Sequence, residues 1–518
     1  MNLSPLGVTA AQQACAIPAV RAEVSAAELI LACGAAANQG GRLLALWGTD
    51  DRDRHRGLCL RVLLIDGDGL TLLEHRLSGS HARYPDIARI FPAASRMQRA
   101  AFDLAGTISD ADDQRPWLRH TAWPEGGFPL QRDFASPPND EPAVDDYPFV
   151  RVEGDGVHEI PVGPVHAGII EPGHFRFQVV GEKVLRLEER LGYVHKGIEK
   201  RFETMPLADA YRLAGRVSGD STVAYACAYA HALEAMSALA VPPRAAWLRA
   251  LALERERIAS HLGDLGHIGN DGGLAFGLAQ FSRLREDVLR VNAVLFRHRL
   301  AMDYIVPGGV AHDIDANRLA ALVQQGHALT REIRALRGIY DEHAGLQDRF
   351  RDCGIVAPAL AAQLGLTGLC GRASGQAHDL RCDFPRAPYD VLEVTGMQRE
   401  SGDVAARVDV RFDEVLESLR LVQLLVERMP GTDLTGEVRH PLPPIAPFRT
   451  GLGLVEGWRG PVLIALESGP DAMVRRCHPH DPSWSNWPVI EHAVIGNIVP
   501  DFPLINKSFN LSYSGHDL

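Results

Sequence analysis

The spacing of apolar residues differs between the two parts of the chain. In the first part, apolar and polar side chains alternate, which predicts strands over 43–51, 58–66 and 70–77. The turn residues between these runs, TDD and DGDG, predict an antiparallel meander with short connections. Helical structure is predicted over 26–38 and 80–106. Residues 1–135 are therefore predicted to form a small α/β domain.

From residue 150 onward, apolar residues recur at the spacing of amphipathic helices. The pattern predicts long helices over 207–239, 245–263, 281–302, 317–343 and 412–429. Pro206, Pro242 and Pro243 stand where helices would begin, a position that suits proline. The Pro- and acid-rich segment 136–149 lacks apolar periodicity and is predicted to be a linker. The predicted fold class is α+β, with the mainly α-helical domain covering 150–518.

Charge and hydropathy narrow the set of partners. The 518 residues carry a net charge of -12, which argues against a nucleic-acid partner, because phosphate backbones attract clustered Lys and Arg. No apolar run reaches the roughly 18 residues that a membrane-spanning helix needs. The nearest candidate, TVAYACAYAHALEAMSALAV, contains His231 and Glu234 and is better explained as a buried helix. We therefore expect no transmembrane segment and no secretory signal in this chain.

The cysteine and glycine patterns exclude several kinds of site. Eight cysteines are spread from position 15 to position 477 with no CxxC pair, which excludes a zinc ribbon or a self-contained iron–sulfur site. Such scattered cysteines are typical of reduced, packed thiols. Neither GxGxxG opening a helix nor GxxxxGK[ST] occurs, so any nucleotide chemistry would lie in another chain.

The densest group of chemically meaningful residues is the loop GPVHAGIIEPGHFRF, residues 163–177. His166, Glu171 and His174 are protonatable groups in a Gly- and Pro-rich segment that precedes a predicted strand pair around Val180 to Lys183. Loop histidines are commonly solvated surface residues, so from these residues alone both a surface loop and the wall of a cavity stay open.

Followed by RLGYVHKGIEK, this loop resembles the start of the large subunit of energy-converting nickel–iron hydrogenases of the hydrogenase-4 and formate hydrogenlyase type. It also resembles the homologous 49-kDa subunit of respiratory complex I. Further matching blocks lie at 253–273, 306–310, 365–391 and 455–461. In the first domain, FDLAG, PWLRH and WPEGGFPLQRDF resemble the 30-kDa subunit of complex I, where Arg119, Arg132 and Asp133 are expected to make domain or subunit contacts.

The resemblance implies where a nickel–iron centre would lie. Hydrogenase large subunits hold it with four cysteines in two CxxC pairs, since soft thiolates bind these metals. The corresponding positions in this chain are Ser218, Ser221, Ser512 and Gly515. A second register would use Ser483 and Asn486, but DPSWSNWPVIEHAV fits better as the helix that precedes the C-terminal motif. Neither register supplies a thiolate, so we expect no metal and no directly bound cofactor.

The same resemblance supplies candidate catalytic residues. Glu171 matches a glutamate that passes protons near nickel, and Asp271 matches an acidic residue beside the quinone cavity of complex I. The quinone-binding tyrosine position is Gly219, and His174 lies about two residues beyond the quinone-binding histidine position. The candidate set, completed by arginines from matched blocks, is Glu171, His174, Asp271, Arg216 and Arg372. For Arg216 and Arg372, core ion pairs are the alternative; Tyr225, Tyr513 and His516 are weaker candidates for a rebuilt hydrogen-bonding site.

By resemblance, the chain is expected to be a peripheral oxidoreductase subunit on the cytoplasmic side of the inner (plasma) membrane. Its expected partners are an iron–sulfur small subunit, which delivers electrons, and membrane subunits. Quinone is the acceptor considered, with proton coupling through Glu171 and Asp271. The alternative is a non-catalytic scaffold or coupling subunit. The two differ in whether the space between the 163–177 loop, residues 216–221 and the C-terminus is open or filled by side chains.

Overall fold

The N-terminal part of the chain is built on a five-stranded sheet. The computed structural model describes residues 3, 7–77, 83–120, 123, 126–135, 147–167, 170–429 and 437–518. The sheet has the order β1-β3-β6-β5-β4. Its strands are β1 (Ala11–Gln12), β3 (Ala19–Glu23), β4 (Arg42–Asp50), β5 (Leu58–Asp66) and β6 (Gly69–Leu77). The predicted meander is confirmed, because β4, β5 and β6 pair in antiparallel fashion. The short strand β3, parallel to β6, was not predicted.

Two helices pack on this N-terminal sheet. Helix α1 (Ala26–Asn38) has the predicted bounds because Ser25 and Glu28 form a capping box at its start. Helix α2 (Ala94–Ala105) begins only after Pro92, so the predicted helical range 80–106 was too long. Proline disfavours helical backbone in the residue before it, which explains the late start. Residues 80–82 of that range lie outside the described residues. So do residues 124–125 of the block WPEGGFPLQRDF and residues 168–169 of the 163–177 loop.

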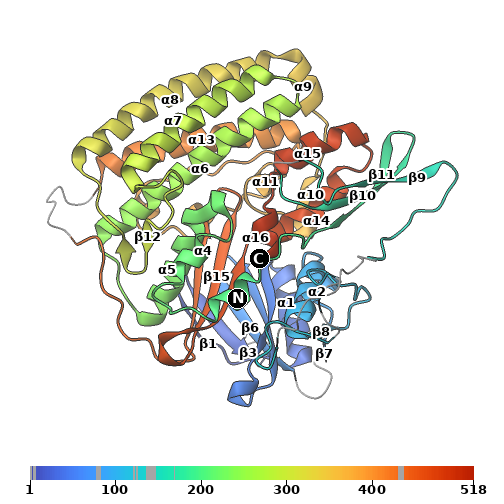
Figure 1. Cartoon of the computed structure of the whole chain (residues 1–518), viewed down its shortest axis with the longest axis vertical. Coiled ribbons are helices and arrows are strands. Elements are labelled where there is room, and N and C mark those ends of the chain that lie inside the picture. The colour runs from blue at the N-terminus through green and yellow to red at the C-terminus, as the bar shows by residue number, and fades with distance from the viewer. Residues whose placement is uncertain are drawn as a thin grey trace.

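Four long helices form a bundle at the opposite end of the molecule (Figure 1). They are α6 (Pro243–Asp271), α7 (Ala275–Phe296), α8 (Ala316–Glu342) and α13 (Val404–Glu427). Pro243 occupies the first turn of α6, as predicted. The single helix predicted over 207–239 was wrong in its first half, where the chain forms α4 (Tyr211–Ala214) and a 3-10 turn. Ser218 adopts an extended conformation, which interrupts the helix before α5 (Thr222–Ser237) begins.

A second sheet lies between the bundle and the N-terminal sheet (Figure 1). It has the order β16-β15-β14-β2 and comprises β2 (Ala14–Cys15), β14 (Thr450–Glu456), β15 (Pro461–Ser468) and β16 (Val474–His480). Helix α5 packs so closely against β14 that a Cβ at Gly453 would lie 1.8 Å from the carbonyl oxygen of Ala228. The N-terminal strand β2 therefore completes a sheet formed mainly by C-terminal residues.

The 163–177 loop leads into a three-stranded antiparallel sheet that projects from the body (Figure 1). Its strands are β9 (Val157–Val162), β10 (His174–Val180) and β11 (Lys183–Arg190), and Val180 pairs with Lys183 at the predicted hairpin.

The segment DPSWSNWPVIEHAV contains α14 (Ser483–Ala493), which confirms its prediction as a helix. The other elements are α3 (Ile198–Phe202), α9 (Ala344–Phe350), α10 (Pro358–Leu364), α11 (Gly368–Arg372), α12 (Leu380–Asp383), α15 (Phe502–Phe509), α16 (Tyr513–Asp517), β7 (Arg83–Tyr84), β8 (Ile108–Ser109), β12 (Ile305–Val306) and β13 (Gly309–Val310).

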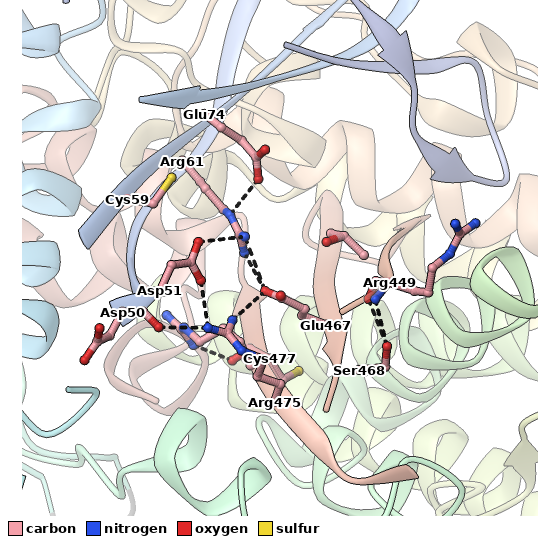
Figure 2. Close-up of polar contacts among 12 residues, drawn as sticks. Asp50, Asp51, Cys59, Arg61, Glu74, Arg449, Glu467, Ser468, Arg475 and Cys477 are labelled. Atoms are coloured by element: carbon pink, nitrogen blue, oxygen red, sulfur yellow. Dashed lines mark hydrogen bonds and ion pairs between the residues drawn. The ribbon is translucent and has the colours of Figure 1, made fainter. Parts of the chain in front are cut away.

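The two sheets share a separate hydrophobic core that includes Trp47, Leu63, Leu454 and Leu463. A cluster of charged residues lies at its edge (Figure 2). Figure 2 shows Arg61 between Glu74 and Glu467, and Arg475 between Asp51 and Glu467. Glu467 is only 1% exposed and lies 3.2 Å from Arg61, 3.0 Å from Arg475 and 2.9 Å from Arg54. Charges from both parts of the chain therefore neutralise one another in a buried position.

Contacts of Arg132 confirm its prediction as an interface residue. Its guanidinium donates to the carbonyl oxygen of Arg475 at 3.1 Å, and its backbone N–H donates to Asp50. Residues 136–146 of the predicted linker lie outside the described residues, so the domain boundaries stay a prediction. Across the described part of the chain, no helix combines the length and apolarity needed to cross a membrane.

Candidate functional site

Two of the four positions that correspond to hydrogenase thiolates are joined by a hydrogen bond. The hydroxyl oxygens of Ser218 and Ser512 lie 2.9 Å apart, although 294 residues separate them in sequence. Ser218 precedes the turn that opens α5, and Ser512 caps α16 by accepting a hydrogen bond from the N–H of Gly515 at 2.8 Å. Ser221, at the start of α5, lies 3.4 Å from the guanidinium of Arg459. The fold therefore brings the predicted positions together.

Side chains of Asp481 and Tyr225 occupy the space beside these positions. The Tyr225 hydroxyl donates to Oδ2 of Asp481 at 2.8 Å. A Cβ at Gly515 would lie 2.5 Å from the same oxygen, so a longer residue could enter only if Asp481 moved. Burial, reinforced by the neighbouring carboxylate, raises the pKa of Tyr225 well above its ordinary value. Tyr225 is therefore a neutral hydrogen-bond donor to Asp481.

Arg459 fixes the other side of the group. Its guanidinium binds both carboxylate oxygens of Asp220, at 2.9 and 2.6 Å, and stacks over Trp458 at 3.9 Å. Asp220 in turn accepts a hydrogen bond from Ser218 at 2.8 Å. We call these residues the C-terminal polar cluster: Ser218, Asp220, Tyr225, Arg459, Asp481 and Ser512. Hydrogen bonds join Ser218, Asp220, Arg459 and Ser512, and Tyr225 and Asp481 form a second pair on the other side of Gly515.

The C-terminal polar cluster does not fit a four-thiolate metal centre. Its hydroxyl oxygens are hydrogen-bonded to each other and to neighbours, and they stay neutral at ordinary pH. A soft metal such as low-valent nickel needs anionic sulfur ligands. The eight cysteines are free thiols at other positions, and the described ranges contain no group of three or more His, Cys, Asp and Glu placed to hold a metal ion.

Glu171 lies at the outer edge of the C-terminal polar cluster. Its carboxylate accepts hydrogen bonds from the hydroxyl of Ser514 at 2.8 Å and from the backbone N–H of Ser514 at 3.0 Å. His166, from the same loop, has a buried Nε2 with no hydrogen-bond partner in the described part of the chain. Burial lowers the pKa of His166, so its imidazole is neutral at pH 7. This edge combines an exposed carboxylate with a buried imidazole nitrogen that has no partner among the described residues.

His174 belongs to the support of the loop. It opens β10, is 8% exposed, and its Nδ1 lies 3.2 Å from the carbonyl oxygen of Gly163. The guanidinium of Arg176 donates to its Nε2 at 3.2 Å. Both ring nitrogens are thus engaged by the loop and the sheet, and they hold the two ends of the 163–177 loop together.

Neither predicted arginine contacts the C-terminal polar cluster. Arg216 is exposed and makes a bidentate ion pair with Asp303, with both distances 2.7 Å. Arg372 is fully buried and binds Glu414 at 2.7 Å and Glu456 at 3.0 Å. Burial would raise the pKa of Glu414, but Arg372 and then His261 hold it well below its ordinary value. These contacts are those of ion pairs that stabilise the fold.

Asp271 is the last residue of α6 and is half-buried. Burial raises its pKa, and Lys507 acts in the opposite direction. Lys507 donates to the side chain of Asn510 at 3.1 Å, and the carbonyl oxygen of Asn510 accepts from Arg459 at 2.6 Å. Asp271 is therefore linked electrostatically, through Lys507, to the C-terminal segment that contacts Arg459.

Glu256 is a further titratable group that sequence reasoning missed. It extends from α6 to the start of α5, where it accepts from the backbone N–H groups of Val223 at 2.7 Å and Ala224 at 3.2 Å. Burial raises its pKa to about 8. The only sequence signal was its position in the matched block 253–273, one turn from other charged residues. It lies directly behind the turn that carries Ser218 and Ser221.

Comparison with known proteins places these features in a family. The model of the respiratory-chain NADH dehydrogenase 49 Kd subunit matches residues 271–448, and that of the 30 Kd subunit matches residues 22–140. Formate hydrogenlyase subunit 5 of Escherichia coli (strain K12) is 30% identical over 488 residues, covering 92% of this chain and 85% of that protein. The chain belongs to the fused 30-kDa/49-kDa family of complex I-like and hydrogenase-type subunits.

Two further known proteins agree with this assignment. Hydrogenase-4 component G of the same strain is 31% identical over 486 residues, covering 92% of this chain and 84% of that protein. A solved chain of the membrane-bound sulfane sulfur reductase, an archaeal respiratory membrane complex, shares the fold with a TM-score of 0.66 and 24% identity. It covers 70% of this chain and 99% of that chain. The resemblance stated from sequence motifs is thereby confirmed.

Within this fused family fold, two residues that close the site come from segments to which the sequence assigned other roles or none. Arg459 belongs to VEGWRGP, and Asp481 opens the segment DPSWSN. Both are brought to Ser512 by the sheet β14–β16, which sequence periodicity did not predict. Tyr225, a weak candidate from sequence, is part of the C-terminal polar cluster, whereas the roles assigned to the five candidate catalytic residues stay predictions.

Proposed function

We propose that this member of the fused family is the large peripheral subunit of a complex I-like membrane oxidoreductase that has no nickel–iron centre. The observation that supports the proposal is the direct hydrogen bond between Ser218 and Ser512, with Asp481 placed against Gly515. Serine hydroxyls are neutral oxygen ligands, whereas low-valent nickel and iron need soft, anionic thiolates. In this chain the two hydroxyls are also already hydrogen-bonded to each other. Redox groups then have to be carried by other subunits.

The proposed partners are an iron–sulfur small subunit and membrane subunits, with attachment at the cytoplasmic side of the membrane. Family membership supports this assembly, since the relatives are named as parts of formate hydrogenlyase and hydrogenase-4. Electrons reach the interface through the partner's cluster in this proposal. The net charge of -12 and the lack of any basic nucleic-acid motif agree with protein partners alone.

The proposed electron acceptor is a quinone whose headgroup binds at the outer edge of the C-terminal polar cluster. Inside the cluster Tyr225 and Asp481 already satisfy each other, so the headgroup would contact His166 and Glu171. The neutral imidazole can hydrogen-bond a quinone oxygen, and the exposed carboxylate can pass the proton that accompanies reduction. His166 then binds, and Glu171 transfers protons between the headgroup and water.

A second candidate function is a non-catalytic scaffold that couples redox partners to membrane subunits. The observation that favours it is the filled space at the former ligand positions, where the hydroxyls of Ser218 and Ser512 each have two protein partners. If the chain is a scaffold, the 163–177 loop contacts a partner subunit, and no small molecule binds at Glu171. The two candidates predict different results for quinone reduction by the purified complex.

The test is quinone reductase activity of the native complex in membranes, with the iron–sulfur partner reduced by a chemical donor. Glu171→Gln is expected to lower turnover by about tenfold or more, because it removes a proton-transfer group. Asp271→Asn is expected to lower it less, since the groups that act on Asp271 are Asn270, Lys507 and His267 and not members of the C-terminal polar cluster. Glu182→Gln, at the exposed turn between β10 and β11, is the matched control and should leave turnover unchanged.

Two results contradict the proposal in different ways. Wild-type complex that reduces no quinone supports the scaffold function. Quinone reduction that is equal in wild type, Glu171→Gln and Asp271→Asn refutes the assigned proton route while leaving the oxidoreductase function in place.

A further inference from the structure

A large cavity lies away from the C-terminal polar cluster and shares no lining residue with it. Its volume is about 740 Å³, within the range of small-molecule sites. The cavity is enclosed by strand β2, the facing parts of α5 and α6, the segment 384–389 and strand β14. Ala238, Ala240 and Arg386 at its rim are exposed, whereas Cys227 and Leu454 at its floor are buried. The cavity is thus reached from solvent and extends into the core.

Most of the cavity wall is apolar. Side chains that contribute include Ile17, Ala235, Ala250, Leu253, Phe384 and Leu454. They come from five different segments, so the space results from how β2, α5, α6, β14 and the 384–389 segment meet. Such a wall favours a ligand with an aliphatic or aromatic body, because binding removes apolar surface from water.

The acidic residues of the cavity are already neutralised by protein partners. Glu234 binds Arg249 through two contacts, at 2.6 and 3.0 Å, and accepts the N–H of Gly308 at 2.8 Å. Glu456 binds Arg372 at 3.0 Å. None of these carboxylates is left to attract a cation. Arg381, the other arginine deep in the lining, is likewise paired with Asp379 and Glu254.

Among the described residues, Arg386 is the charged group of the lining that lacks a counterion. Cys15, Glu234 and Arg249 act on its guanidinium only through space, without a hydrogen bond or ion pair among the described residues. The nearest acidic candidates do not supply a negative charge: Glu234 is engaged by Arg249, and burial raises the pKa of the Cys15 thiol, which keeps it neutral. One positive charge therefore lies at the exposed rim of a largely apolar space.

His231 adds a second polar atom with no protein partner in the described ranges. Its Nδ1 is buried and unpaired there. Burial, and then the positive charges of Arg386 and Arg249, lower the pKa of His231 well below its ordinary value. The imidazole is therefore a neutral hydrogen-bonding group on the α5 wall, in the electrostatic neighbourhood of Arg386.

We propose that this cavity binds a small amphipathic carboxylate, with the carboxylate on Arg386 and the apolar body along α5, α6 and β14. A planar guanidinium and a carboxylate match in geometry and charge, and the pairing is strong where water is partly excluded. His231 hydrogen-bonds the same head or a water beside it. A monoanion fits better than a phosphate dianion, because the lining offers one uncompensated positive charge.

Calorimetry with the full-length chain and octanoate tests this proposal. Octanoate is expected to bind, while octanol, which has the same chain without the charge, binds at least about tenfold more weakly. Arg386→Gln should weaken octanoate binding by about tenfold or more, and Arg386→Lys by less. Ala246→Phe, which fills the cavity from α6, should abolish binding. Arg89→Gln, whose side chain is 72% exposed and does not line the cavity, is the matched control and should bind normally.

Several outcomes would overturn the proposal. These are no octanoate binding by wild type, equal binding of octanoate and octanol, unchanged affinity in Arg386→Gln, or tighter binding of octyl phosphate than of octanoate. Thermal melting of each variant verifies that it is folded. Arg386 has no partner in the described structure, so its replacement should leave the melting temperature unchanged.

Discussion

Ser218 and Ser512 show how a change of one atom alters a buried site. Two thiolates at this separation would repel each other unless a metal cation lay between them, whereas two hydroxyls hydrogen-bond directly at 2.9 Å. Tyr225, Asp481 and Arg459 then complete a group that needs no ligand for its stability. At the residue scale, the site is a self-satisfied polar network with one open edge at Glu171 and His166.

Glu256, behind the same turn, gives a prediction about pH. Its pKa is about 8 in the folded chain and close to the ordinary value of about 4.5 when unfolded. Between these values the folded state holds the proton that the unfolded state has lost, so stability falls as the pH rises from about 4.5 to about 8. Glu256 contributes at most about 1.4 kcal/mol per pH unit to this slope.

Glu256→Gln should make this slope smaller, because glutamine cannot ionise but can still accept from the start of α5. The contribution of Glu189, whose pKa burial also raises to about 8, should remain. Urea denaturation at several pH values between 5 and 8 measures the effect. Glu182→Gln, at an exposed turn, is the control and should keep the wild-type slope. A variant slope equal to that of wild type would show that Glu256 is ionised throughout.

The contact between α5 and β14 determines where the turn with Ser218 lies. The two elements approach so closely because Gly451 and Gly453 have no side chains facing the helix backbone. A Cβ at Gly453 would lie 1.8 Å from the carbonyl oxygen of Ala228, which cannot move without bending α5. At the element scale, these glycines place α5, and with it the turn 218–221, against the C-terminal sheet.

Gly453→Ala is therefore expected to destabilise the chain by about 3 kcal/mol, as overpacking against backbone does. Gly34→Ala is the matched control: Gly34 lies inside α1, a Cβ there would meet no atom within 4 Å, and alanine should stabilise by about 0.5–1 kcal/mol. Urea denaturation compares the two. Equal stability of Gly453→Ala and wild type would contradict the close packing of α5 on β14.

Periodicity predicted the elements better than it predicted their contacts. The capping box at Ser25 and Pro243 at the start of α6 are local signals, so α1 and α6 begin where expected. The turn at Ser218 interrupts a long apolar pattern, so periodicity alone predicted one continuous helix over 207–239. The family resemblance predicted that Ser218 and Ser512 are neighbours. The ion pair of Arg216 with Asp303 was not predicted, because it depends on tertiary contacts that the local sequence does not indicate.

The two parts of the chain are joined by a buried apolar layer and a charged cluster at its edge (Figure 2). Glu467 on β15 forms ion pairs with three arginines: Arg54 and Arg61 from the N-terminal part, and Arg475 from β16. Strand β2 adds a backbone link by pairing with β14. At the scale of the whole molecule, the fused 30-kDa-like and 49-kDa-like parts are thus held together by more than the connecting chain.

Glu467→Ala is expected to lower the stability of the full-length chain by about 3–5 kcal/mol, because three arginines would lose their shared counterion. Glu437→Ala is the matched control, since that side chain is 77% exposed and should contribute almost nothing. Urea denaturation followed by tryptophan fluorescence measures both. A loss below about 1 kcal/mol for Glu467→Ala would contradict the importance of the charged cluster.

Metal analysis of the native complex tests the central claim most directly. Purification through a tag on this chain, followed by quantification of nickel and iron per chain, is the measurement. The account predicts iron from the partner's clusters and no stoichiometric nickel, because Ser218, Ser221, Ser512 and Gly515 provide no thiolate. About one nickel per chain, lost on replacing Ser218 and Ser512 by alanine, would contradict it.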